Sequence, residues 1–205
     1  SVLLERILRE RPQSGEKDRS KGFLVAERSD DNSYYENLPK GWVLARLADI
    51  ADIVMGQSPS GETITENSSG MEFHQGKIYF THRKLAHSGK FTSESNKVAA
   101  KGSVLLCVRA PVGIVNITDR EVAIGRGLCA LKPLRGISVE FIFHWLTAFQ
   151  GYFVEQASGT TFMAISIDVV RNQIIPIPPL AEQQRLVGAI EQILERLNKI
   201  AEDLI

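Results

Sequence analysis

The stretch that decides the fold is Ile174-Ile-Pro-Ile-Pro-Pro-Leu-Ala-Glu-Gln-Gln-Arg185. Its first half alternates isoleucines with Pro176, Pro178 and Pro179. Proline has no N–H to give to a sheet and holds the preceding residue in an extended conformation. The segment is therefore predicted to be an extended strand at the edge or boundary of a sheet.

A helix with one apolar face follows this strand. Its large apolar residues are spaced 4, 3, 4, 3 and 4 apart, which is the a/d pattern of a coiled coil. The pattern reaches the last residues without a cap or stop signal, so we expect an apolar surface outside this helix to cover it. The residues of this predicted partner or dimer seam are Leu186, Ile190, Ile193, Leu197, Ile200 and Leu204.

The sequence before the strand predicts a mixed domain. Strands are expected at Ile78–Thr81, Ser103–Arg109, Gly113–Thr118 and Glu121–Pro133, and Leu47–Met55 reads as a short helix or a helix-to-strand passage. Val139–Ala157 has a helical apolar stripe. The predicted fold class is α+β, with a mixed, twisted β-sheet, packed helices and a long coiled-coil-type helix after them.

Four regions follow from this pattern. Residues 1–10 carry a short helical stripe (Leu3, Leu4, Ile7 and Leu8) and are expected to be the tail of a helix. Residues 11–37 are polar and are expected to be a flexible linker. The folded domain is expected at 38–179, and the long helix at 180–205.

The charge distribution is more informative than the net charge of zero. Residues 75–135 hold eleven Lys and Arg against three acidic residues, a balance of +8 that the rest of the chain offsets with −8. One basic region in an otherwise acidic chain is typical of a polyanion-binding face, although charges scattered over a solvated surface give the same count.

The densest basic stretch is Gln75–Lys101, where aromatic, amide and hydroxyl side chains separate the basic ones. Lys and Arg attract phosphates, whereas Arg, Gln, Thr and His can also read base edges. The predicted DNA-binding residues are Gln75, Lys77, Thr81, His82, Arg83, Lys84, His87, Lys90 and Arg126. Arg126 and Arg109 each follow an apolar strand at a tight turn, and both a phosphate contact and a structural role stay open for them.

Other chemistry finds little support. Gly56–Gly61 has the glycine spacing of a phosphate-binding loop, but Glu62 stands where that loop needs lysine, so a surface turn or a DNA-backbone contact fits better. His74, His82 and His87 lack the spacing of a metal site, and no metal or catalytic residue is predicted.

The two cysteines, Cys107 and Cys129, lie in apolar runs and are expected to be buried free thiols, which fits a cytoplasmic protein. No segment has the length and apolarity of a membrane span.

Five segments together resemble the specificity subunits of type I restriction–modification enzymes. They are Gly56–Gly61, Val104–Gly113, Ile124–Gly127, Ser158–Ser166 and the junction Pro176–Arg185, and the resemblance runs from about Leu38 to the last residue. It implies a non-catalytic target-recognition domain for double-stranded DNA that reads one half of a split site. By the same resemblance, modification and restriction subunits are the partners, and they carry S-adenosylmethionine, ATP and Mg²⁺.

The resemblance also implies a second recognition domain, held by a pair of long helices. We therefore expect this chain to be the second half of a subunit, or a half-length subunit that forms a homodimer through its last helix. The Ser158–Ser166 segment is expected to cap the next element, with a phosphate contact from Thr160 or Thr161 as the alternative. Two other functions stay open: a scaffold whose basic face binds an acidic protein, and a small enzyme with an unrecognised site.

Overall fold

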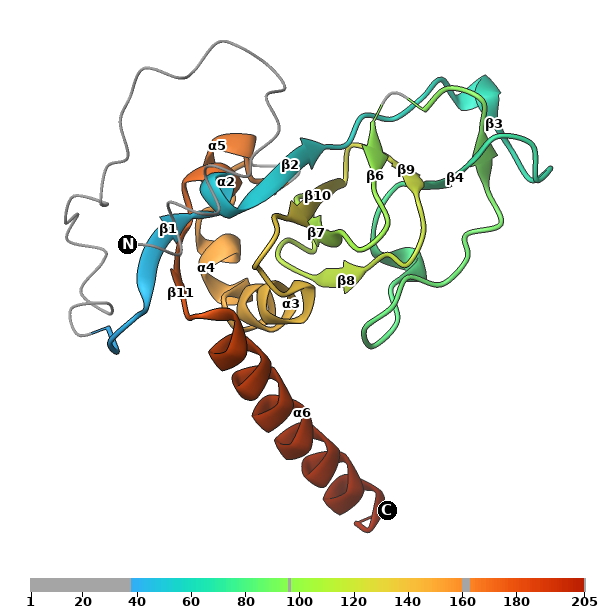
Figure 1. Ribbon diagram of the computed structural model, residues 1–205. Coiled ribbons are helices and arrows are strands. Elements are labelled where there is room, and N and C mark those ends of the chain that lie inside the picture. Colours follow the sequence, from blue (N-terminus) through green and yellow to red (C-terminus); the bar gives the residue numbers. More distant parts are fainter. Residues whose placement is uncertain (1–37, 96, 160–162, 205) are drawn as a thin grey trace, which may run out of the picture.

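The computed structural model describes residues 38–95, 97–159 and 163–204 (Figure 1). The helix tail predicted at 1–10 and the linker predicted at 11–37 lie outside the described residues, as do Thr160 and Thr161. The described part is α+β, as the sequence predicts: three sheets and a set of short helices form a body, and one long helix leaves it (Figure 1).

The proline-interrupted segment forms β11 (Ile174–Ile177), which pairs antiparallel with β1 (Val43–Arg46) in a two-stranded sheet. Pro176 lies opposite Leu44, and Ile175 and Ile177 are fully buried on the other face. A two-stranded sheet leaves each strand with a free edge, where a missing N–H costs no ladder bond. The predicted edge strand is therefore confirmed.

The central sheet has the strand order β2-β10-β7-β8, formed by β2 (Ala51–Met55), β10 (Leu128–Pro133), β7 (Val104–Cys107) and β8 (Val115–Ile117). Side chains alternate across it, since successive residues of a strand point to opposite faces. Val104 and Leu106 join the larger apolar core, whereas Leu105 and Cys107 join a second, smaller one. This sheet is thus a wall between two cores.

Helices cover the larger core. They are α2 (Leu47–Ile50), α3 (Val139–Ala148), α4 (Gln150–Glu155) and α5 (Ile167–Asn172). Of the two alternatives left open for Leu47–Met55, a short helix or a helix-to-strand passage, α2 and β2 show the second. Ser166 accepts a hydrogen bond from the Val169 N–H and caps α5, as expected of that segment.

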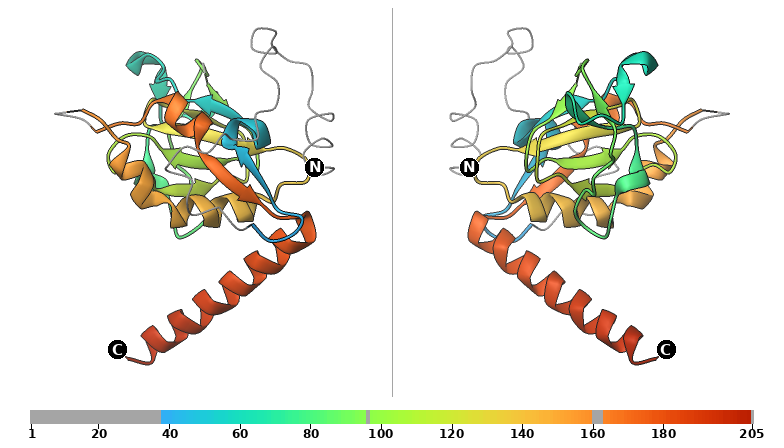
Figure 2. Two further views of the ribbon diagram at one scale, coloured as in Figure 1. Left: turned by 90° about the vertical axis from the view of Figure 1, so that its left-hand side faces the viewer. Right: turned by 90° about the vertical axis from the view of Figure 1, so that its right-hand side faces the viewer.

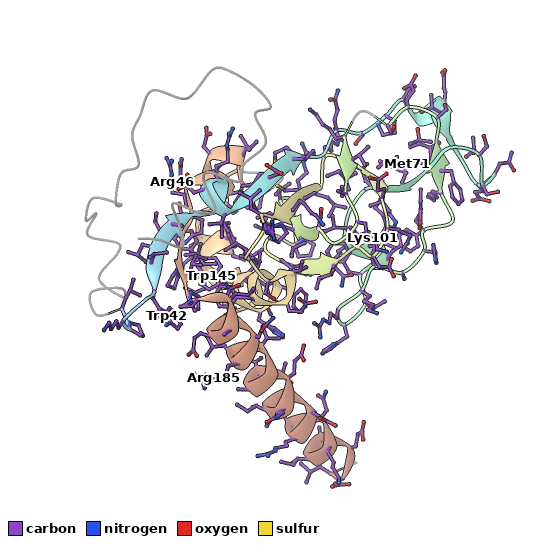
Figure 3. All side chains as sticks on the ribbon, viewed as in Figure 1. Trp42, Arg46, Met71, Lys101, Trp145 and Arg185 are labelled. Atoms are coloured by element: carbon purple, nitrogen blue, oxygen red, sulfur yellow. The ribbon has the colours of Figure 1, made fainter. Side chains whose placement is uncertain are left out.

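The single helix predicted at Val139–Ala157 is instead two helices. The chain departs from helical geometry at Phe149, whose ring stacks on Trp145 at 4.1 Å between centroids (Figure 3 labels Trp145). The turn at Gly113 packs against the Gln150 backbone at the same place, where a Cβ on the glycine would lie 3.0 Å from the Gln150 carbonyl oxygen. Contacts from the turn after β7 therefore coincide with the break.

The smaller core lies between the central sheet and an outer sheet of short strands in the order β3-β5-β4-β9-β6. These strands are β3 (Ile64–Thr65), β5 (Phe91–Thr92), β4 (Met71–His74), β9 (Val122–Ile124) and β6 (Val98–Ala99). The 3-10 turn η2 (Gly61–Thr63) precedes them. Trp42 and Met71 mark opposite ends of the body in Figure 3.

Two strand predictions in this region are wrong. Ile78–Thr81 is not a strand, because η3 (Lys77–Tyr79) is a 3-10 turn that leaves Ile78 83% exposed. Glu121–Pro133 is not one strand, because β9 and β10 belong to different sheets. The chain crosses between the sheets at Gly125-Arg126-Gly127.

The long helix α6 (Leu180–Glu202) begins directly after Pro179 and projects away from the body (Figure 2). Its first turn is tied down by Gln183, a fully buried side chain. The Gln183 amide donates to the carbonyls of Pro178 and Gly136, and its carbonyl accepts from the Ser138 N–H at 2.8 Å. One buried amide therefore connects α6 to the loop before α3.

Within the described residues, no helix combines the length and apolarity needed to cross a membrane.

Candidate nucleic-acid interface

Three loops that lie far apart in the sequence meet beside the edge where β9 passes into β10. The Gly56 N–H donates to the Leu128 carbonyl and the Gln57 N–H to the Ile124 carbonyl. The backbones are so close that a Cβ on Gly56 would lie 2.1 Å from the Gly125 carbonyl oxygen. The glycine needed at position 56 is thus explained by packing between loops and not by phosphate binding in a nucleotide loop.

Gln75 is held between these loops. The Arg126 N–H donates to the Ser58 hydroxyl at 3.3 Å, and this hydroxyl donates to the Gln75 Oε1 at 2.9 Å. A Cβ on Gly125 would lie 2.2 Å from the same Oε1. The Gln75 Oε1 therefore faces the Ser58 hydroxyl, and no acceptor among the described residues takes a hydrogen bond from the Gln75 NH₂ group.

A cleft of about 280 Å³ opens next to Gln75. The turn after β7 forms its other wall, where the Val108 N–H donates to the Gly127 carbonyl and the Ala110 N–H to the Met163 carbonyl. The cleft is lined by Gln75, Lys77, Arg109, Arg126, neighbouring small residues and Met163. None of these lining residues is acidic.

The remaining titratable group in the cleft wall, the Cys107 thiol, is neutral at ordinary pH. Burial raises its pKa to about 12, and the nearby Lys77 ammonium opposes this only in part. Cys107 and Cys129 are both free and buried, as predicted. The cleft therefore presents three cationic side chains and no compensating negative charge.

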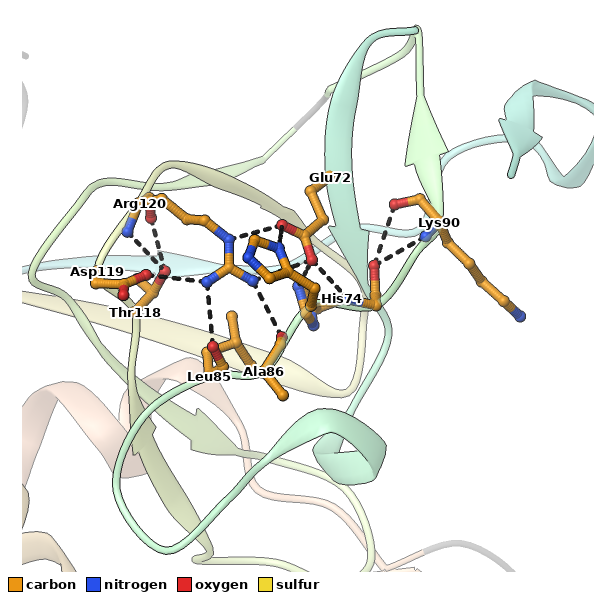
Figure 4. Close-up of polar contacts among 10 residues, drawn as sticks. Glu72, His74, Leu85, Ala86, Lys90, Thr118, Asp119 and Arg120 are labelled. Carbon is orange, nitrogen blue, oxygen red and sulfur yellow. Dashed lines mark hydrogen bonds and ion pairs between the residues drawn. The ribbon is translucent and has the colours of Figure 1, made fainter. Parts of the chain in front are cut away.

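Four predicted DNA-binding residues lie on the loops beside this region. Thr81 closes a turn by donating to the Lys84 carbonyl. Lys84, His87 and Lys90 are exposed, and Figure 4 shows the Lys90 side chain pointing away from the neighbouring polar cluster. Their DNA contacts stay predictions.

That polar cluster is centred on Glu72, an almost buried carboxylate (Figure 4). It accepts from the Arg120 Nε at 2.7 Å, from the Arg120 Nη2 at 3.0 Å and from the Ser88 N–H at 2.6 Å. Burial alone would raise the pKa of Glu72, but the hydrogen bonds from Arg120, Ser88 and His87 outweigh it and lower the pKa to about 2. Arg120 also donates to the carbonyls of Leu85 and Ala86, so this basic residue serves the fold.

His74 and His87 contact the same carboxylate. The His74 Nε2 and the His87 Nδ1 each lie 3.1 Å from a Glu72 oxygen. Burial lowers the pKa of His74 despite the nearby Glu72 charge, so the ring is neutral at ordinary pH. Among the residues that the structure covers, no group of three or more His, Cys, Asp or Glu is arranged to hold a metal.

Arg83 and His82 lie away from the cleft, at a groove of about 720 Å³ between α3 and α6. The Arg83 guanidinium pairs with Glu191 of α6 at 2.5 Å and with Glu140 of α3 at 3.6 Å. His144 of α3 also approaches Glu191, at 3.8 Å. Arg83 therefore links the loop after η3 to the long helix, a role that sequence alone did not suggest.

The predicted seam of α6 lies on the outside of the helix. Val187 is buried against the body and Leu186 is half-buried, whereas Ile193, Leu197 and Ile200 are 57%, 55% and 56% exposed. Ile190 and Leu204 are also exposed. The apolar face that the heptad spacing predicts is present, and in the described chain only its first turn is covered.

The sequence did not predict that Ser58, Gln75 and Arg126 are joined by hydrogen bonds. It also did not predict that Arg109 lines the same cleft. The glycines at 56, 125 and 127 were the available signal, because each lies where a Cβ would collide with another loop.

Known proteins resemble this chain over most of its length. A curated relative, the putative type I restriction enzyme MjaX specificity subunit of Methanocaldococcus jannaschii, is 30% identical over 88% of this chain and 44% of its own. The crystal structure of the HsdS subunit from Thermoanaerobacter tengcongensis is 35% identical, with a TM-score of 0.74 over 82% of this chain and 41% of that one.

A type I restriction–modification S subunit from M. genitalium, 22% identical, shares the fold with a TM-score of 0.57 over 81% of this chain and 43% of its own. The chain thus spans less than half the length of these relatives. The sequence model of the family described as "Type I restriction modification DNA specificity domain" matches residues 39–205. The five segments, the fold and this match together place the chain in the type I restriction–modification DNA specificity domain family.

Proposed function

We propose that this chain recognises one half of a split DNA target, as a target-recognition module of a type I specificity subunit. The observation that carries the proposal is the set of basic side chains on the cleft and on the loops of the outer sheet, in a member of a DNA specificity family. The charged groups of the Lys77, Arg109 and Arg126 side chains have no ion-pair or hydrogen-bond partner among the described residues, so they are available to phosphates.

In this proposal the chain performs no chemistry. Methylation and cleavage, with S-adenosylmethionine, ATP and Mg²⁺, belong to modification and restriction subunits that the chain directs to its target in the cytoplasm. The exposed seam of α6 joins it to a second recognition domain or to another copy of itself. No observation favours a scaffold that binds acidic proteins.

The test is a selection from randomised duplexes with the full chain, followed by fluorescence anisotropy on the selected sequence at several salt concentrations. We expect a defined half-site and an affinity that falls steeply with salt through counterion release. Replacing Lys77, Arg83, Lys84 and Lys90 together by Ala should weaken binding to every duplex. The same replacement should reduce the salt slope by about one for each DNA phosphate that the variant no longer neutralises.

Two outcomes would count against the proposal. A wild-type chain that enriches no sequence and binds duplexes without salt dependence does not recognise DNA. An unchanged affinity in the quadruple variant would remove the loops around Gln75–Lys101 from the DNA face.

A further inference from the structure

The cleft beside Gln75 differs from the rest of the predicted DNA face in its shape and in the charge of its lining. It is concave, its shape is set by loops that hydrogen-bond one another, and its charged groups are all cationic. The basic residues elsewhere on the outer sheet stand on an open surface. A concave, cationic site is suited to an anion of defined geometry.

The donors are arranged around a single opening. Arg109 comes from the turn after β7, Arg126 from the crossing between β9 and β10, and Lys77 from η3. The Gln75 NH₂ group adds neutral donors, because the Ser58 hydroxyl engages the Oε1 and no described residue accepts from the NH₂ group. An arginine fork matches the two oxygens of a phosphate, and an amide NH₂ group can donate a further hydrogen bond to the same anion.

Reading of a base edge at this place is disfavoured by the same geometry. The bidentate pairing of a glutamine with adenine uses both its oxygen and its nitrogen, in the plane of the base. Here the Ser58 hydroxyl and the backbone at Gly125 crowd the oxygen. Among its charged side chains the cleft wall supplies only donors, so the amino groups of adenine and cytosine find no charged partner there.

We propose that this cleft is a phosphodiester site: Arg109, Arg126, Lys77 and the Gln75 amide hold one backbone phosphate of the DNA and read no base. The inference rests on the proposed function and assigns phosphate binding and base recognition to different parts of the domain. The cleft fixes the position of the backbone relative to the domain, and the loops carrying Lys84, His87 and Lys90 face the bases. Ser58 is a positioning residue that acts through Gln75.

The experiment uses the full chain, the selected half-site duplex and three unrelated duplexes of equal length. Arg109→Ala and Arg126→Ala should each weaken binding to all four duplexes by the same factor, about tenfold for the removal of a charge-assisted hydrogen bond. Each should lower the salt slope by about one and leave the selected sequence unchanged. Arg109→Lys should keep the slope, and Arg196→Ala on exposed α6 is the matched control that should change neither quantity.

Nuclear magnetic resonance of the Gln75 side-chain amide and of the Gly127 N–H locates the ligand directly. Duplex DNA should shift both signals. Ser58→Ala should reduce the shift of the Gln75 signal. Inorganic phosphate should compete with the duplex only at far higher concentration. A change in the selected base at one position in Arg109→Ala or Arg126→Ala would overturn the inference. So would duplex binding that leaves these two signals unmoved, with the proposed function intact.

The remaining outcomes concern the identity of the anion. Shifts with inorganic phosphate and none with any duplex would overturn both the inference and the proposed function. Absence of any salt-dependent duplex binding by the wild-type chain would do the same.

Discussion

Glu72 on β4 of the outer sheet holds Arg120 and the Ser88 N–H by hydrogen bonds. Glu72→Gln would leave Arg120 with the exposed Asp119 as its one anionic partner among the described residues, and losing the almost buried partner costs about 3 kcal/mol in unfolding free energy. Urea denaturation measures this. The exposed neighbour provides a control, since Glu121→Gln should change stability by less than about 0.5 kcal/mol.

The same carboxylate predicts a pH dependence. Its pKa falls from 4.5 to about 2 on folding, so its charge stabilises the folded state fully above pH 4.5. That contribution, about 3 kcal/mol by linkage, is lost as the pH falls from 4.5 towards 2. The stability gap between wild type and Glu72→Gln should therefore narrow below pH 4.5, and a gap that stays constant down to pH 3 would contradict the assignment.

Arg83 has two competing roles, a DNA contact and the link to α6. A link predicts that Arg83→Ala and Glu191→Gln each lower stability by about 1 kcal/mol or less, because the pair is partly exposed, and that Arg83→Ala has the larger effect because it also removes the pair with Glu140. A DNA contact predicts that Arg83→Ala alone weakens binding and, if Arg83 reads a guanine, relaxes sequence preference. Measuring both stability and DNA affinity in both variants separates the roles.

At the scale of elements, the attachment of α6 rests on Gln183. Gln183→Ala leaves three backbone groups without their partner, and unsatisfied buried groups cost about 1–3 kcal/mol each. We expect a loss of about 3 kcal/mol in urea denaturation, reduced from the sum because water can enter at the first turn. Gln184→Ala, at the exposed neighbouring position, should be nearly neutral, and equal effects in the two variants would refute the role of Gln183.

The elements also show what a sequence can predict. β7, β11 and α6 were predictable because apolar runs and heptad spacing carry their own signal, and tertiary contacts do not override it. The segment after Gly76 was not: Ile78, Tyr79 and Phe80 favour a strand, yet Tyr79 packs edge-on against His74 and its carbonyl accepts from the Ala86 N–H. These tertiary contacts stabilise a tight turn, and the strand or turn preferences of the residues in this segment do not predict them.

The candidate site shows the same limit. The composition of residues 75–135 showed the basic character of the site. It did not show which of the basic side chains form ion pairs within the fold. Arg120 and Glu72 are 48 positions apart and Arg83 and Glu191 are 108 apart, so these pairs depend on how strands and helices pack. Gln75 and Arg126 come together through Ser58, again by way of the fold.

At the scale of the whole molecule, the exposed seam of α6 predicts self-association. Ile193 and Leu197 face solvent in the described chain, and a second copy would bury both. Replacing both by Glu would place charges in that interface and should give monomers in sedimentation velocity. Asn198→Glu, on the groove side of the helix, is the control that should leave the oligomer intact. A wild-type chain that stays monomeric at high concentration would refute the prediction.

The wall formed by β7 and β10 has a consequence for how such a protein diversifies. Leu105 and Leu128 pack in the smaller core, whereas Leu106 and Cys129 pack in the larger core. At these positions the two cores share the backbone of β7 and β10 but no side chain. Exchange of residues packed in the smaller core therefore leaves the side chains of the larger core in place. The outer half can therefore acquire new surface chemistry over generations while the half that anchors α6 keeps its architecture.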